Sequence, residues 1–290
     1  MNFKNGQELE ACCVETGKSI AQICIEREMD LTGWSEDTIR AEMRKDYDVM
    51  RQAVDRALKE ELHSMGGLLG GEARKLKARL DAGPTVCGSL MSKAIGAAMG
   101  VMEVNASMGL IVAAPTAGSC GILPGSLLTT AEQFGWSDDQ IIDALFVAGA
   151  IGLIITRNAT VSGAEGGCQA ETGSAAAMAA AGIVSALGGT PRQTLDAAAT
   201  ALKNVMGLVC DPIAGLVESP CQKRNALGAA NALISAEMAL AGIPSIIPFD
   251  EVVDAMYKVG KRMPMELRET ALGGLAHTPT GCAICSRIYQ

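Results

Sequence analysis

Residues 170–187 read AETGSAAAMAAAGIVSAL, a stretch in which most side chains are small and apolar. Alanine and methionine favour helix over strand, and small side chains let helices pack closely. A helix that is apolar on all sides has no face to turn toward solvent, so it is expected inside the protein. The stretch therefore predicts a buried helix.

Four further segments share this composition: 88–106, 138–157, 191–208 and 224–241. Apolar and polar residues do not alternate convincingly in any segment, although a short hairpin within 66–90 or 106–113 would fit the sequence. We predict an all-α or nearly all-α fold. It is a bundle of buried Ala- and Met-rich helices joined by Gly- and Pro-rich loops.

The first 65 residues are more polar than the rest of the chain. Residues 7–29 predict one helix. A longer amphipathic helix is predicted from Ser35 up to the glycine pair at 66–67, because apolar residues keep helical spacing along it. We divide the chain into a helical arm, residues 1–65, and a larger helical domain, residues 66–290, within one compact unit.

A phrase that contains a tryptophan occurs twice, as GWSEDTI at 33–39 and as GWSDDQI at 135–141. Ser35 and Ser137 are predicted N-caps, and the acids that follow them complement the helix dipole. Gln140 completes a capping box with Ser137. The repeat therefore indicates two helix starts that use the same chemistry rather than a duplicated domain.

The net charge of −8 argues against nucleic-acid and anionic-membrane partners. The first ten residues lack the apolar core of a signal peptide. The most apolar stretch, 141–155, contains Asp143 and is too short to span a bilayer. We expect a soluble cytoplasmic protein, whose ten cysteines are reduced, buried or metal-bound rather than cross-linked.

Three loops, 103–125, 156–175 and 210–226, hold nearly all the polar residues of the apolar half. Cys168 and Cys221 are predicted to begin helices, where the dipole lowers a thiol pKa and so favours the thiolate that metals bind. Cys210 is predicted to end the preceding helix. The alternative for each is a small buried apolar side chain.

Lys223 and Arg224 fall in a predicted first helical turn, which disfavours cations unless an anion lies nearby. A disulfide between Cys210 and Cys221 is disfavoured by compartment. Three roles remain open: zinc binding together with Cys282 and Cys285, nucleophilic catalysis without a clear histidine partner, and an iron–sulfur cluster on three thiolates. Composition does not choose among them.

Three long motifs resemble one known family. They are NASMGLIVAAPTAGSCGILPG, GCQAETGSAAAMAAAG and CDPIAGLVESPCQKRNALGAANA. They are similar to the signatures of the α subunit of bacterial iron–sulfur-dependent L-serine dehydratases, and the similarity covers nearly the whole chain. This resemblance implies an L-serine ammonia-lyase that forms pyruvate and ammonia. The alternatives are a related lyase acting on threonine or cysteine and a non-catalytic zinc or iron–sulfur regulatory protein.

The resemblance also implies a [4Fe–4S] cluster on Cys168, Cys210 and Cys221, with one iron left open as a Lewis acid and no pyridoxal phosphate. Candidate substrate-binding residues are Asn105, Thr116, Ser119, Lys223, Arg224 and Asn225. Candidates for the catalytic base or its support are Glu165, Glu171 and Glu218. Cys282 or Cys285 is a candidate cap of the open iron.

Single-chain members of this family carry a β domain with a Ser-Ser-His-Thr-type motif that contributes to the active site. The present sequence contains no such motif, and its His277-Thr278 is followed by Pro279. The resemblance therefore implies that a β subunit on a separate chain completes the enzyme. We expect an oligomer that acts on a small amino acid, with no nucleic-acid or membrane partner.

Overall fold

A computed structural model describes residues 2–290, and its regular structure in that range is helical, with 13 α-helices and no strand. The bounds of the helices are α1 Gly6–Thr16, α2 Ile20–Thr32, α3 Glu36–Lys59, α4 Glu72–Asp81, α5 Gly88–Ala106, α6 Ile122–Phe134, α7 Asp138–Asn158, α8 Gly163–Gly166, α9 Cys168–Ala186, α10 Pro191–Asn204, α11 Cys221–Leu240, α12 Phe249–Arg262 and α13 Pro279–Ile288. The predicted all-α fold is confirmed.

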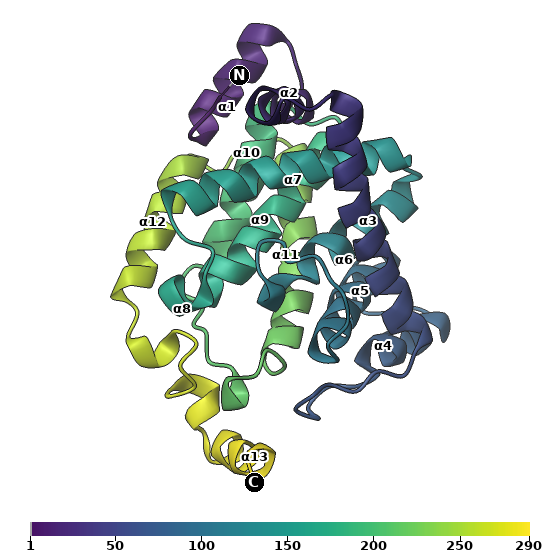
Figure 1. Cartoon of the computed structure of the whole chain (residues 1–290), viewed down its shortest axis with the longest axis vertical. Coiled ribbons are helices and arrows are strands. Elements are labelled where there is room, and N and C mark those ends of the chain that lie inside the picture. Colours follow the sequence, from purple (N-terminus) through teal and green to yellow (C-terminus); the bar gives the residue numbers. More distant parts are fainter. Residues whose placement is uncertain (1) are drawn as a thin grey trace.

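Helix α9 forms the centre of the bundle and packs against α6, α7, α10 and α11. Of its 19 residues, only Glu171, Ser185 and Ala186 are not buried, so the expectation for AETGSAAAMAAAGIVSAL is confirmed. Small residues permit the close packing: a Cβ on Gly182 would lie 2.9 Å from the Ala144 carbonyl oxygen of α7. Figure 1 shows α7 and α9 crossing the middle of the molecule, with α1 and α2 at one end and α13 at the other.

The predicted hairpin is absent from both of its candidate segments. Residues 66–90 contain helix α4, and residues 106–113 form an irregular connection after α5. The single helix predicted over 7–29 is also wrong. Gly17 ends α1 with φ of 68°, and Ser19 then caps a second helix with a capping box. A left-handed glycine is a common helix terminator, and it turns the chain here.

The predicted helix starts are confirmed at Ser35 and Ser137, whose side chains each accept a backbone N–H of the following turn. Thr190 caps α10 in the same way. Helix α7 is long and apolar enough to cross a membrane by length and composition, contrary to the expectation that this stretch is too short. Two thirds of its most apolar window, 67%, is buried inside the protein, as in a core helix of a soluble protein.

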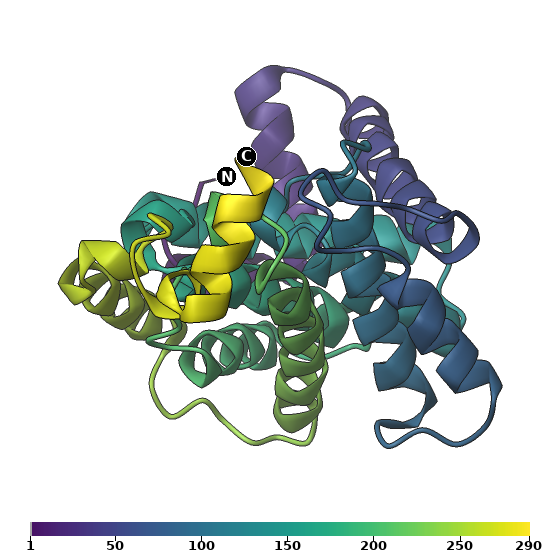
Figure 2. The ribbon, with the colours of Figure 1, turned by 90° about the horizontal axis from the view of Figure 1, so that it is seen from below.

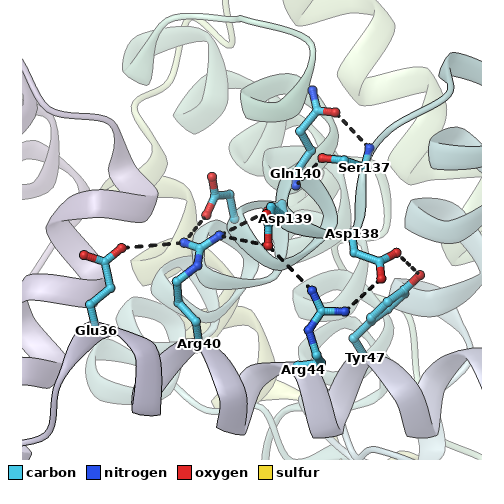
Figure 3. Close-up of polar contacts among 9 residues, drawn as sticks. Glu36, Arg40, Arg44, Tyr47, Ser137, Asp138, Asp139 and Gln140 are labelled. Atoms are coloured by element: carbon cyan, nitrogen blue, oxygen red, sulfur yellow. Dashed lines mark hydrogen bonds and ion pairs between the residues drawn. The ribbon is translucent and has the colours of Figure 1, made fainter.

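Helix α3 of the arm is joined to the start of α7 by a group of polar contacts that we call the α3–α7 seam (Figure 3). Arg40 lies 2.7 Å from Asp143, and Arg44 lies 2.8 Å from Asp138. The Tyr47 hydroxyl donates to Asp138 at 3.1 Å. The first acid of α7 therefore complements the helix dipole, as predicted, and also binds two side chains of the arm.

Candidate functional site

The three polar loops meet around Glu171, in the first turn of α9. Thr116 of the first loop donates a hydrogen bond to Glu171 Oε1 at 2.6 Å. Cys210 of the third loop lies 4.0 Å from Glu171 Oε2 through its sulfur. Asn225 of α11 binds the first loop at both ends, donating to the Gly118 carbonyl at 2.8 Å and accepting from Gly121 N–H at 3.0 Å. Residues separated by 39 to 107 positions in sequence are thus fixed at one place.

Glycines allow this approach. A Cβ on Gly163 would lie 2.7 Å from Glu171 Oε2 and 3.0 Å from Cys210 Sγ. A Cβ on Gly118 would lie 3.0 Å from Glu171 Oε1. Separations this short require atoms to move, so the loop backbones could not lie so close to the carboxylate with larger residues.

Cys168 and Cys221 begin α9 and α11, as the sequence predicts. The position predicted for Cys210 is wrong, because α10 ends six residues earlier at Asn204. Cys210 instead lies in extended backbone and forms an isolated parallel bridge with Arg268. Its N–H donates to the Leu267 carbonyl at 2.8 Å, and its carbonyl accepts from Glu269 N–H at 2.7 Å. The C-terminal segment therefore fixes this cysteine from both sides.

All three of these cysteines are buried, and none is in a disulfide. Burial raises the pKa of Cys221 to about 12 and also raises the pKa values of Cys168 and Cys210. The prediction of a lowered thiol pKa at the helix starts is therefore wrong, because desolvation by burial is the largest effect on each thiol and raises its pKa. The charge of Cys168 also raises the pKa of Cys210 and of Cys221, so the three sulfurs lie in one neighbourhood.

Arg224 is a cation whose charge acts on two of these thiols. Its guanidinium favours the thiolates of Cys168 and Cys221, lowering both pKa values against the effect of burial. Its Nη2 lies 2.7 Å from Asp211, and its Nη1 donates to the Val209 carbonyl at 2.9 Å. Burial alone would lower the pKa of Arg224, but Cys168 and Asp211 raise it overall, so the guanidinium stays charged.

Glu171 is the carboxyl group that the site perturbs most clearly. Burial raises its pKa, the hydrogen bond from Thr116 lowers it, and the charge of Glu269 raises it again. The net shift is upward. A raised carboxyl pKa brings a general acid or base closer to neutral pH, which is the shift that proton-transfer catalysis requires.

The remaining candidates fall into two groups. Asn105, Thr116 and Ser119 belong to the first loop, which Asn225 of α11 contacts. Ser119 lies 3.0 Å from the Thr116 hydroxyl, and Asn105 donates to the Ala117 carbonyl at 3.2 Å. Lys223 and Glu165 are exposed, and the Lys223 ammonium binds its neighbour Gln222 at 2.9 Å. The structure thus brings the first group to Glu171 and leaves the second group at the surface.

Glu218 is buried and fully engaged with another part of the chain. Its carboxylate accepts from the Ser64 hydroxyl at 2.6 Å, from Gly66 N–H at 2.7 Å and from Leu68 N–H at 3.1 Å. These bonds join the loop between Cys210 and Cys221 to the connection that precedes α4. These contacts give Glu218 a structural role, in which it fixes the third loop to the segment at Ser64.

Cys282 and Cys285 lie on α13, where Cys282 is exposed and Cys285 is partly exposed. Helix α13 packs on η2, the short helix Ile213–Gly215 that follows Cys210, and the Tyr289 hydroxyl donates to the Ala214 carbonyl at 2.9 Å. Figure 2, which looks onto this end of the molecule, shows α13 in the foreground. The tail is therefore docked beside the Cys210 loop, and capping of a metal by its cysteines stays a prediction.

Sequence analysis missed two acids of this site. Asp211 pairs with Arg224 and also accepts from Leu275 N–H at 2.7 Å, so it connects the cysteine loop to the tail. Glu269 reaches the site through its backbone bond to Cys210. The only local signal was the Asp-Pro after Cys210, and no spacing pattern connects residue 269 with the three loops.

The model of the family described as serine dehydratase alpha chain matches residues 15–276. Over 99% of its length the chain is 50% identical to the probable L-serine dehydratase, alpha chain, of Bacillus subtilis, and covers 95% of that relative. It is 46% identical to the L-serine dehydratase, alpha chain, of Peptoniphilus asaccharolyticus, with 96% of each chain covered. The chain belongs to the serine dehydratase alpha-chain family.

This serine dehydratase alpha chain also matches longer relatives. It is 37% identical to L-serine dehydratase 1 of Escherichia coli over 94% of its own length, but it spans only 61% of that protein. The resemblance stated from the three motifs is confirmed at the level of the family. The family match places the cysteine loops inside the matched region, while Cys282 and Cys285 lie beyond it.

Proposed function

We propose that this chain is the α subunit of an L-serine dehydratase that holds a [4Fe–4S] cluster on Cys168, Cys210 and Cys221 and converts L-serine to pyruvate and ammonia. The observation that carries the proposal is the gathering of three buried, unbridged thiols, one from the second loop and two from the third, beside Arg224 and Glu171. The names of the most similar relatives support the reaction.

The donor set suits such a cluster. Within residues 2–290, no group of three or more His, Cys, Asp or Glu side chains is arranged to hold a single metal ion. A cluster has a different requirement, because each thiolate binds its own iron and the three sulfurs need not converge on one point. Arg224 supplies a fixed positive charge that offsets the thiolates, and burial protects them from solvent.

Glu171 is the residue to which we assign proton abstraction. Its Oε1 accepts from Thr116, which leaves Oε2, on the side of Cys210, to take the α-proton of the substrate. Its raised pKa makes it a stronger base than an exposed carboxylate. The cluster, when bound, supplies a Lewis acid for the departing hydroxyl. Loss of proton and hydroxide gives aminoacrylate, whose imine tautomer takes up water and releases ammonia and pyruvate.

A second chain is part of the proposal. The relatives named alpha chain are covered over 95% and 96% of their lengths, whereas the chain spans 61% of the longer Escherichia coli protein. We infer that a β subunit supplies what the longer relatives carry in their remaining sequence. Lys223 is exposed and bonded only to its neighbour Gln222 among the described residues, so its ammonium is accessible to a partner.

The test is an anaerobic assay of pyruvate and ammonia from L-serine, L-threonine and L-cysteine, with the α chain alone and with its β chain. We expect activity on L-serine that requires both chains. If the enzyme prefers L-threonine or L-cysteine, that amino acid takes the place of L-serine as the proposed substrate. A colourless zinc protein without lyase activity would refute the proposal. Glu171→Gln is expected to lower kcat about 100-fold or more, whereas the exposed Glu237→Gln on α11 should not change it.

A further inference from the structure

Glu269 lies in the C-terminal segment and has a backbone conformation that is costly for its residue type. Its φ is 64°, and Ala271 two residues later has φ of 56°. Side chains other than glycine disfavour this left-handed region, and such residues persist where the surrounding structure holds them. Here the bridge to Cys210 holds the backbone, through the bonds at Leu267 and at Glu269 itself.

Glu269 lies beside the candidate active site, because its backbone N–H donates to the Cys210 carbonyl at 2.7 Å. Its charge raises the pKa values of Glu171, Cys210 and Cys221, although burial is the largest cause for each group. Coulomb interactions weaken with distance, so the carboxylate lies in the same neighbourhood as these three groups. Glu269 is also half-buried, so water screens this charge less than at the surface.

The Glu269 carboxylate is unpaired in the part of the chain that the structure describes. Within residues 2–290 it makes no ion pair and no side-chain hydrogen bond, although its backbone N–H is bonded. Two buried acids of the region do have partners: Asp211 contacts Arg224 and Leu275, and Glu218 contacts the segment at Ser64. A partly buried, unpaired anion is costly, and a bound cation would offset that cost.

An α-amino acid brings such a cation, because its amino group is protonated at neutral pH. Glu171 is assigned to the α-proton and cannot also neutralise the ammonium without losing its function as base. We propose that Glu269 binds the α-ammonium group of the substrate and so sets the requirement for an amino acid. This inference rests on the proposed function of the site.

The test compares ligands with and without the amino group, using the assembled enzyme of α and β chains under anaerobic conditions. In Glu269→Gln, KM for L-serine should rise about tenfold or more, because a charge-assisted contact is lost, and kcat should fall less. The inhibition constant of 3-hydroxypropanoate, which keeps the hydroxyl and carboxylate of serine, should stay the same or fall. Glu266→Gln, an exposed acid of the same segment, is the matched control and should change neither value.

Equal weakening of L-serine and 3-hydroxypropanoate, or no weakening of either, would overturn the inference. Glu269→Gly separates binding from folding, because glycine relieves the left-handed strain. It should lose L-serine affinity as Glu269→Gln does, while the Tm of the α chain stays unchanged or rises. A large fall of Tm in both variants would show that Glu269 stabilises the folded state and does not bind the substrate. Failure of the wild-type enzyme to deaminate L-serine would refute the proposed function itself. If the wild-type enzyme is active but Glu269→Gln affects L-serine and 3-hydroxypropanoate equally, only the role of Glu269 is refuted.

Discussion

Two arginine–aspartate contacts have different surroundings: one lies at the surface between α3 and α7, and the other lies inside the protein, within the third loop. In the α3–α7 seam, the side chain of Arg40 is 22% exposed and that of Asp143 is 49% exposed. At the candidate site, the side chains of Arg224 and Asp211 are only 13% and 3% exposed. Water and salt screen the first contact but hardly reach the second. The same pairing therefore attaches α3 weakly at the seam, whereas loss of one partner of the buried pair inside the third loop is costly.

The largest expected effect is at the buried contact. Asp211→Asn leaves Arg224 charged and without its anion, which should lower the free energy of unfolding by about 3 kcal/mol. The double variant Asp211→Asn/Arg224→Gln should recover part of this loss, because the uncompensated charge is gone. Urea denaturation of the α chain measures both, and a loss below about 1 kcal/mol in Asp211→Asn would contradict the account.

The tie made by Glu218 should have an intermediate effect. Glu218→Ala leaves the Ser64 hydroxyl and two backbone N–H groups without their acceptor, so we expect a loss of about 2 kcal/mol and faster hydrogen exchange at Gly66 and Leu68. Ser64→Ala removes one donor only and is the control with the smaller loss. Unchanged exchange in Glu218→Ala would show that other contacts hold this loop.

The exposed seam should contribute less. A double-mutant cycle of Arg40→Ala and Asp143→Ala is expected to give a coupling free energy of about 0.2–1 kcal/mol that decreases in high salt. Urea denaturation at two ionic strengths measures it. A salt-independent coupling as large as the effect of Asp211→Asn would remove the distinction between the two regions.

The smallest effect is the acid sensitivity of the seam. The hydrogen bonds from Arg44 and then from Tyr47 hold the pKa of Asp138 below its ordinary value of 3.8. The stabilisation is therefore present above that pH and is lost as the pH falls through the lower pKa of the folded state. Arg44→Ala should move the midpoint of acid unfolding to higher pH. A midpoint that stays the same or moves lower would show that Arg44 does not stabilise the carboxylate.

Local chemistry made much of the fold predictable. Capping residues such as Ser137 and Thr190 and the all-round apolar composition of α9 act within a few residues, so the sequence carries them directly. The break at Gly17 was missed, although residues 15–19 read ETGKS and contain no apolar side chain. A glycine does not reveal by itself that its backbone is left-handed.

The site divided in the same way. Cys168 and Cys221 were placed at helix starts from their neighbours in sequence. Cys210 was predicted at a helix end, and Glu269 was not predicted at all. The positions of both residues depend on a bridge between the third loop and a segment almost 60 residues later. The direction of the thiol pKa shift was also wrong, since burial by distant helices decides it. Both errors concern long-range packing, which local patterns do not carry.

The central claim is that Cys168, Cys210 and Cys221 hold the cluster. Its most direct test is anaerobic reconstitution of the α chain with its β chain, followed by iron and sulfide analysis and absorption spectra before and after addition of L-serine. We predict one [4Fe–4S] cluster per α chain, a spectrum that L-serine changes, and loss of the cluster in Cys168→Ser, Cys210→Ser and Cys221→Ser but not in the exposed control Cys87→Ser. An intact cluster in all three site variants, or a wild-type protein that takes up zinc and no iron, would contradict the account.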